Sequence, residues 1–176
     1  MHKVETTPAW RFWAALGVQV LIVLTVPLPK VAAYTTGTPV VLRTVPVDPL
    51  DFLRGRYVRL NYEIATSEEA GKLLPTWPKD GEPVYFTLKP GSPAWTAVAV
   101  SARWPATVPP GCVVLAGTSR WGGATFGLEE YYLPEDQGDA LADAMTAHAT
   151  GNLAELKVDG RGTAVLTGFV VDKQRF

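Results

Sequence analysis

Cysteine and histidine are scarce in this chain of 176 residues. Cys112 is the single cysteine, and His2 and His148 are the two histidines. A lone cysteine cannot form an intramolecular disulfide, and so few histidines leave little from which to build a zinc site or a conventional catalytic triad. We therefore expect neither a metal nor a cofactor. Because Cys112 begins an apolar run over residues 112–115, it is expected to be a small core residue rather than a nucleophile.

Charge is also in short supply. Charged residues make up 19% of the chain, with 16 basic against 17 acidic side chains and a net charge of −1. An average globular domain holds about 25% charged residues. A nearly neutral chain has no broad positive field to attract nucleic acid or anionic lipid, so nucleic acid is not expected as a partner. The shortage of charge indicates that part of the chain avoids water.

The part that avoids water is an apolar run of about 19 residues over positions 10–28. A helix of that length, at about 1.5 Å per residue, approaches the roughly 30 Å hydrocarbon thickness of a bilayer. Tryptophans near its start are typical of the membrane interface, and Pro27 and Pro29 are expected to end the helix. We predict a single transmembrane helix over residues 10–29. Gln19, the one polar residue near mid-span, is a candidate contact with a partner helix, or it bonds its own backbone.

Short N-terminal tails usually stay cytoplasmic while a long following domain is translocated. Residues 1–9 are therefore predicted to form a cytoplasmic tail and residues 34–176 a periplasmic or lumenal domain of a single-pass membrane protein. The main alternative is a cleaved signal peptide, because the small residues at 31–33 suit a signal peptidase. The apolar run exceeds the roughly 7–15 residues of an ordinary signal-peptide core, which favours a retained signal anchor.

Beyond the anchor there is room for one domain, since domains commonly hold about 100–200 residues. Short β-branched or alternating segments are divided by proline and glycine, which is the pattern of strands. The expected fold is mainly β (α+β), a compact β-rich sandwich or barrel-like domain with two short helices. The predicted strands are residues 39–45, 56–64, 83–89, 94–102, 111–116, 124–133, 153–158 and 163–172, and the predicted helices are 66–74 and 135–149.

Local signals support several of these elements. Thr66 and Glu69 match a capping box, in which the threonine accepts the amide of the glutamate and the glutamate side chain reaches back. The glycines of residues 159–162 supply the positive φ that a hairpin turn needs. Within residues 56–64, alternation places Tyr57 and Tyr62 on opposite faces, so one of them belongs to the core and the other is free for contact.

The sharpest local signal is a run that we call the first motif segment, residues 46–62. It resembles the GDYXXLXY family, membrane-anchored bacterial proteins named for a Gly-Asp-Tyr-x-x-Leu-x-Tyr motif. Residue 56 departs from that motif, because Arg56 stands where the family has aspartate. A role of that carboxylate is therefore not transferable. The residues that fall on the family pattern are Pro46, Asp48, Pro49, Arg54, Gly55, Tyr57, Leu60 and Tyr62.

A second motif segment, residues 126–135, strengthens the resemblance. It is similar to a Tyr/Phe-Gly-x-Glu-x-Tyr-x-x-Pro-Glu run of the family, and the matching residues are Gly127, Glu129, Tyr131 and Pro134. The resemblance implies an anchored architecture but no particular activity. From the residues themselves, the first motif segment contains a loop that Arg54 and Arg56 staple to nearby aspartates, or else it recognises a ligand or partner.

Three functions remain open from the sequence. The first is a non-enzymatic accessory or assembly subunit that docks on an integral membrane protein, with Trp121 at an exposed loop tip as a candidate contact. The second is an extracytoplasmic sensor that binds a small molecule or lipid in a pocket of the β domain. The third is a signal-peptidase-like protease, for which Thr44 would be the only hydroxyl near the expected nucleophile position.

Overall fold

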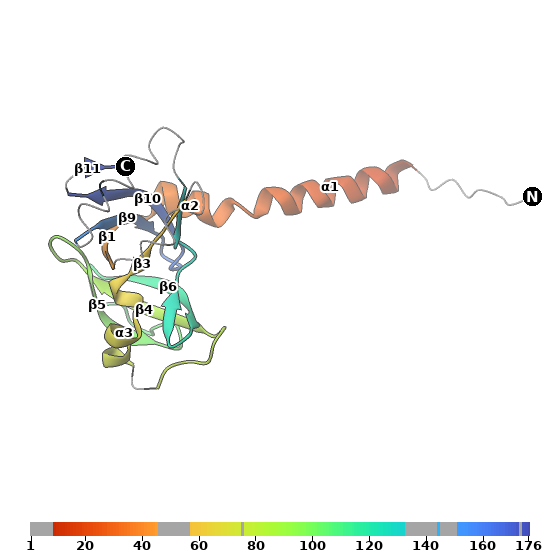
Figure 1. The fold of residues 1–176 in the computed structure, drawn as a ribbon. Coiled ribbons are helices and arrows are strands. Elements are labelled where there is room, and N and C mark those ends of the chain that lie inside the picture. The colour runs from red at the N-terminus through yellow and green to blue at the C-terminus, as the bar shows by residue number, and fades with distance from the viewer. Residues whose placement is uncertain (1–8, 46–56, 75, 133–143, 145–150, 173) are drawn as a thin grey trace, which may run out of the picture.

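The structure is a computed structural model that describes residues 9–45, 57–74, 76–132, 144, 151–172 and 174–176. Figure 1 shows a long N-terminal helix that leads away from a β-rich domain, and the C-terminus lies on that domain. The predicted fold class is confirmed, because sheets dominate the domain and helices are few. Residues 1–8, 46–56 and 133–143 are the longer stretches outside the described residues.

The N-terminal segment forms two successive helices, α1 (Ala9–Thr25) and α2 (Leu28–Thr36). Pro27 occupies the N-cap of α2, and a second proline lies in its first turn. Proline fits the first turn of a helix because its missing N–H has no intrahelical acceptor there. The two prolines therefore open a new helix, where the sequence had indicated that they end the helical segment.

Helix α2 packs against β9 (Leu153–Val158) and β10 (Ala164–Val171). Ala33 is fully buried. Lys30 Nζ donates to the carbonyl of Ala164 at 2.8 Å, and Lys157 Nζ donates to the carbonyl of Tyr34 at 2.7 Å. At the C-terminal end of α2, the amide of Gly37 donates to the carbonyl of Ala33 at 3.0 Å. Helix α2 is thus a built-in part of the domain.

Five strands form the sheet beside α2, in the order β11-β10-β9-β1-β3, with antiparallel neighbours. The turn between β9 and β10 is the predicted one: Gly162 has φ +83°, and the Asp159 carboxylate accepts from the amides of Arg161 and Thr163. The remaining strands of this sheet are β1 (Thr38–Val45), β3 (Asn61–Tyr62) and β11 (Gln174–Arg175).

A second sheet has four antiparallel strands in the order β5-β4-β6-β7, and a separate ribbon pairs β2 with β8. The strand bounds are β2 (Tyr57–Arg59), β4 (Pro83–Lys89), β5 (Thr96–Ser101), β6 (Val113–Arg120), β7 (Gly123–Thr125) and β8 (Glu130–Tyr132). The strands predicted at 83–89 and 153–158 match β4 and β9 to the residue.

Two predicted strands are broken in the structure. In the strand predicted at 56–64, the described residues form β2, β3 and the start of a short 3-10 helix, η2 (Glu63–Ala65). Residues 124–133 form β7 and β8, which lie in different sheets. Gly127, at φ +68°, turns the chain between these two strands. The alternating pattern in the sequence therefore indicated which side chains are buried. It did not indicate where one strand ends and the next, paired with a different strand, begins.

Helix α3 (Ser67–Leu73) confirms the first predicted helix of the domain, and the Thr66 side chain accepts from Glu69 N as its cap. The predicted reciprocal hydrogen bond, from the amide of Thr66 to the Glu69 side chain, is wrong. Thr66 N donates to the carbonyl of Glu63, and Glu69 instead binds Lys72 at 2.6 Å. The preceding η2 supplies the acceptor. Of the second predicted helix, 135–149, only Ala144 lies within the described residues, and it is helical.

Side chains from both larger sheets form one continuous core. Three aromatic rings lie at its centre: Phe126 makes edge-to-face contacts with Tyr62 at 5.7 Å and with Phe86 at 5.3 Å between ring centroids. Cys112 was expected in the core but is only half-buried, because it lies in the turn before β6. Other fully buried side chains are Leu42, Leu60, Leu88, Leu115, Leu156 and Phe169.

Candidate functional site

The two motif segments, distant in sequence, lie side by side in the structure. Strand β2 pairs with β8, with Tyr57 opposite Tyr132, Val58 opposite Tyr131, and Arg59 opposite Glu130. One residue further along, Leu60 N donates to the carbonyl of Glu129 at 2.7 Å. The structure therefore assembles both segments into a single module, which the sequence alone did not predict.

Tyr62 locks the module to the core. Its hydroxyl donates to the carbonyl of Leu128 at 2.8 Å, and the side chain is almost fully buried. Burial, and secondarily the negative charge of Glu129, raises the pKa of the Tyr62 phenol well above its ordinary value of about 10. Tyr62 is thus a neutral hydrogen-bond donor at any physiological pH, and it is the tyrosine of the first motif segment that belongs to the core.

Glu129 organises the turn of the second motif segment. Its carboxylate accepts from the backbone amides of Phe126 and Leu128, the latter at 3.0 Å. Gly127 lies between these two amides, and its positive φ allows both N–H groups to converge on one carboxylate. Glu129 was expected to lie within the strand predicted at 124–133. It precedes β8 instead and holds the turn.

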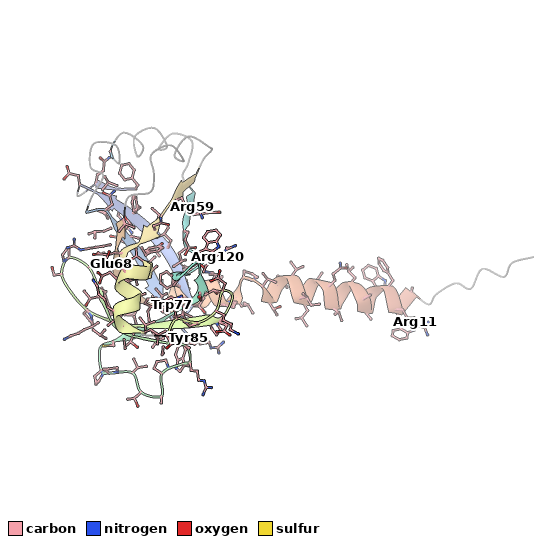
Figure 2. All side chains as sticks on the ribbon, turned by 60° about the horizontal axis from the view of Figure 1, so that its bottom comes forward. Arg11, Arg59, Glu68, Trp77, Tyr85 and Arg120 are labelled. Atoms are coloured by element: carbon pink, nitrogen blue, oxygen red, sulfur yellow. The ribbon has the colours of Figure 1, made fainter. Side chains whose placement is uncertain are left out.

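Above this module lies an open cleft of about 340 Å³. Two guanidinium groups, from Arg59 in β2 and Arg120 at the end of β6, line it together with the indole of Trp121. Figure 2 shows Arg59 and Arg120 on the side of the domain from which α1 leaves. The other lining residues are Asn61, Tyr62, Ala65, Thr66, Gly123, Ala124, Thr125 and Glu129.

The turn between β6 and β7 projects the indole into solvent. Trp121 is 80% exposed and has φ +49°, in the left-handed region that side chains other than glycine rarely adopt. Its amide donates to Asp80 Oδ1 at 3.0 Å, and the Arg120 guanidinium lies 5.1 Å from the centroid of its ring. Gly123 follows, and a Cβ there would lie 2.7 Å from the carbonyl of Ala65. The turn is therefore held closely against η2.

A second, smaller hollow of about 190 Å³ lies near the start of β5, where Arg43, Glu63 and Trp95 line it. Both hollows are at the surface, and the core between the sheets is packed with side chains in the described part of the domain. That arrangement offers no support for a sensor with its pocket inside the β domain.

The remaining candidate residues are dispersed. Gln19 lies on the exposed surface of α1. The Thr44 hydroxyl is buried in β1 and donates to the carbonyl of Asn152 at 3.2 Å. Within the described residues, no group of three histidine, cysteine, aspartate or glutamate side chains is arranged to hold a metal. The motif residues Pro46, Asp48, Pro49, Arg54, Gly55, Arg56 and Pro134 lie outside the described residues.

Sequence reasoning missed the two arginines of the cleft. Arg59 lay in the strand predicted at 56–64, Arg120 lay outside every predicted strand, and Trp121 was the candidate contact. A signal for Arg120 was present, since it directly precedes the Trp121-Gly122-Gly123 turn. No local signal could have brought Arg59 to the same place, because the β2–β8 pairing does that.

Comparison with known proteins agrees with the motifs. The model of the family described as GDYXXLXY protein matches residues 19–169, which is more than half of the chain. Neither the curated proteins nor the solved structures contain a match.

Proposed function

The chain belongs to the GDYXXLXY protein family, and from that premise we propose that it is a non-enzymatic accessory subunit held in a bilayer by α1. Its β-rich domain lies on the extracytoplasmic side and docks on an integral membrane partner. The proposal has three supports: the exposed apolar anchor, the way α2 joins it to the domain, and the contact residues around the cleft.

The observation that carries the proposal is the surface of α1. None of its side chains is buried, and large apolar groups such as Trp10, Phe12, Leu21 and Ile22 are each about 60% exposed or more. A helix that is apolar all round needs either a core or a membrane to cover it. In the described part of the chain, one helical segment, Ala9–Thr36, is long and apolar enough to cross a membrane.

Helix α2 supports retention of the anchor. A signal peptidase would cut beside the small residues at 31–33, but Ala33 is fully buried against the sheet and Lys30 binds the carbonyl of Ala164. Removal of these residues would uncover the surface of β9 and β10 and leave that carbonyl without its donor. The segment that follows the anchor therefore stabilises the domain, which favours its retention.

The chemistry around the cleft supports binding rather than catalysis. The Glu129 carboxylate is occupied by two backbone amides, and the Tyr62 hydroxyl by a carbonyl. These polar groups hold the fold together. The exposed groups, Arg59, Arg120 and Trp121, are of the types that dominate binding energy at protein interfaces.

A partner in the same membrane can meet the chain at two levels. Gln19 is a polar side chain in the middle of the apolar helix, where it can hydrogen-bond another helix. Arg120 lies on the side of the domain from which α1 leaves (Figure 2), and the ring of Trp121 lies beside its guanidinium. We propose that one embedded protein contacts the chain at both levels.

The first experiment asks whether the anchor stays in place. Full-length chain with a C-terminal tag is expected to remain in membranes after an alkaline carbonate wash, and its intact mass is expected to include α1. A mature chain that begins near Tyr34 and diffuses freely would contradict the proposal.

The second experiment asks for the partner. The chain is purified in mild detergent, and co-purifying proteins are quantified by mass spectrometry. Gln19→Leu and Trp121→Ala are expected to reduce the same partner several-fold, while Val18→Leu in α1 and Val98→Ala in β5, two exposed apolar positions, leave it unchanged. A chain that always purifies alone would rule out an accessory role.

A further inference from the structure

We propose that the cleft between Arg59 and Arg120 binds the phosphate group of a lipid headgroup in the bilayer that holds α1. The inference rests on the proposed membrane anchoring, and adds to it a second point of attachment that sets the orientation of the domain. It is carried by the charge, the geometry and the position of the cleft.

Two guanidinium groups meet in a hollow of headgroup size, about 340 Å³. Among the described residues, neither Arg59 nor Arg120 forms an ion pair, and the contact that Arg120 makes is with the face of Trp121. Arginine offers paired N–H donors whose spacing matches phosphate oxygens, and it is more weakly hydrated than lysine. Asn61 lines the same hollow and adds a polar group, while the hydroxyl of Thr66, which also lines it, is engaged by Glu63 and by the amide of Glu69.

Acidic groups near the cleft are already engaged. Glu129 is the one carboxylate among the lining residues, and its oxygens accept the amides of Phe126 and Leu128. Asp80, next to the β6–β7 turn, accepts the amide of Trp121. Such hydrogen bonds offset the negative charge locally. The lining therefore offers two arginines against one carboxylate that is held by backbone donors, while Glu130 of β8 lies opposite Arg59 in the β2–β8 pairing.

The position of the cleft selects a lipid as the source of the phosphate. Figure 2 places both arginines on the side of the domain from which α1 leaves. A domain tethered to a bilayer meets headgroups at a high effective concentration, so that even a weak site is occupied. The net charge of −1 gives no long-range attraction, which makes these short-range contacts decisive.

Trp121 completes the site. Tryptophan is enriched at the membrane–water interface, where its amphipathic ring lies at headgroup level. The ring is 80% exposed on a backbone with φ +49°, a conformation that asparagine or glycine would adopt with less strain. A large exposed ring in a strained turn beside two arginines fits insertion among headgroups.

The test uses full-length chain in nanodiscs of two compositions, phosphatidylglycerol and digalactosyldiacylglycerol, an uncharged lipid without phosphate. Hydrogen–deuterium exchange is followed for residues 117–125. Exchange is expected to be roughly tenfold slower in phosphatidylglycerol, as for a ligand at about ten times its Kd. The double variant Arg59→Gln/Arg120→Gln loses this difference, whereas Arg161→Gln, an exposed arginine of the β9–β10 turn, keeps it. Equal melting temperatures of the three proteins show that the variants are folded.

Four results would overturn the inference. One is equal exchange in both lipids, and another is slower exchange in phosphatidylglycerol that persists in the double variant. The third is slowing by inorganic phosphate in dodecyl maltoside micelles without any effect of phosphatidylglycerol, which would assign the cleft to a free anion. A protein that binds at the cleft through both arginines in either lipid would assign it to an acidic partner and also overturn the lipid assignment.

Failure of the proposed function would look different. A chain that does not enter either nanodisc, or that is processed near Tyr34, contradicts membrane anchoring itself. A chain that enters both nanodiscs and shows no headgroup effect contradicts only the phosphate site.

Discussion

At the scale of single residues, a buried tyrosine and a half-buried glutamate provide the hydrogen bonds of one short turn in the motif. Tyr62 donates to the carbonyl of Leu128, and Glu129 accepts from the amides of Phe126 and Leu128. A buried backbone group without a partner costs free energy comparable to a lost hydrogen bond, so these side chains make the turn possible inside the protein. This accounts physically for a tyrosine and a glutamate at these positions.

Removal of the Tyr62 hydroxyl tests this account. Tyr62→Phe keeps the ring contact with Phe126 but leaves the Leu128 carbonyl without its donor. We expect the free energy of unfolding to fall by about 1–3 kcal/mol, measured by urea unfolding of the full chain in mild detergent. Tyr85→Phe is the control, because no described residue hydrogen-bonds the Tyr85 hydroxyl, and it is expected to change stability little. Equal effects of both variants would contradict the account.

The same hydroxyl predicts a pH dependence. Burial, assisted by Glu129, raises the pKa of Tyr62 in the folded protein, while the unfolded chain ionises near its ordinary value of about 10. Below pH 10 both states keep the proton, and the contribution to stability is complete. Above pH 10 only the unfolded state releases it, so the free energy of unfolding falls by about 1.4 kcal/mol per pH unit from this group.

Alkaline unfolding of wild type and Tyr62→Phe measures this contribution. The variant lacks the phenol hydroxyl, so the difference in the free energy of unfolding between the two proteins is expected to shrink as the pH rises from about 9 to about 11. This window surrounds the pKa of about 10 that a tyrosine has in the unfolded chain. A difference that stays constant over this window would mean that Tyr62 ionises equally in both states.

At the scale of elements, α2 connects α1 to the β domain. Its small residues lie against β9 and β10, and its end is closed by Gly37, whose amide donates to the carbonyl of Ala33. A Cβ at Gly37 would lie 2.3 Å from that carbonyl oxygen and 3.0 Å from Val158 N. The close approach of helix end and strand therefore requires glycine.

Gly37→Ala is expected to separate α2 from the sheet. Overpacking of this kind typically costs about 1–3 kcal/mol, and each kcal/mol lowers the Tm by about 2–4 °C in a domain of this size. Gly160→Ala is the matched control, since a Cβ at Gly160 meets no atom within 4 Å. Thermal unfolding of both full-length variants in detergent gives the comparison. If Gly37→Ala melts with the wild type, α2 does not pack as described.

At the scale of the whole molecule, both larger sheets share one core and are joined by backbone hydrogen bonds. Trp95 N donates to the carbonyl of Val41 at 2.7 Å, and Ala116 N donates to the carbonyl of Gly162 at 3.0 Å. The ring of Phe126 touches residues from both sides of the core, Tyr62 and Phe86. Separation of the two sheets would therefore expose the apolar side chains of the shared core.

The β domain is therefore expected to unfold in one cooperative transition. Far-UV circular dichroism, which reports strands, and tryptophan fluorescence, which reports packing, should give the same midpoint. Phe126→Ala, at a typical cost of about 3–5 kcal/mol, should lower both midpoints together. Separate midpoints in either protein would show that the two sheets fold independently.

Local patterns predicted the elements that depend on near neighbours. Strands 83–89 and 153–158, the turn at 159–162 and the Thr66 cap are all confirmed, because alternation, glycine and capping act between residues a few positions apart. The apolar run over 10–28 likewise indicated its helix without reference to the rest of the chain. Contact of Gln19 and Trp121 with a partner stays a prediction.

Tertiary structure alone decided how distant segments combine. The alternating pattern within residues 56–64 could not show that β2 pairs with β8 while β3 pairs with β1. A strand ends where its neighbouring strand ends, and the neighbour is far away in the sequence. Nor could it show that α2 lies on β9 and β10, where Ala33 is buried. It also could not show that Arg59 and Arg120 line the same cleft. Side-chain periodicity is set by the local backbone, whereas pairing and register depend on the closure of long loops around a common core. The sequence by itself therefore determined the apolar N-terminal helix, most of the strand positions and the class of fold, and the packing of the two motif segments determined the site.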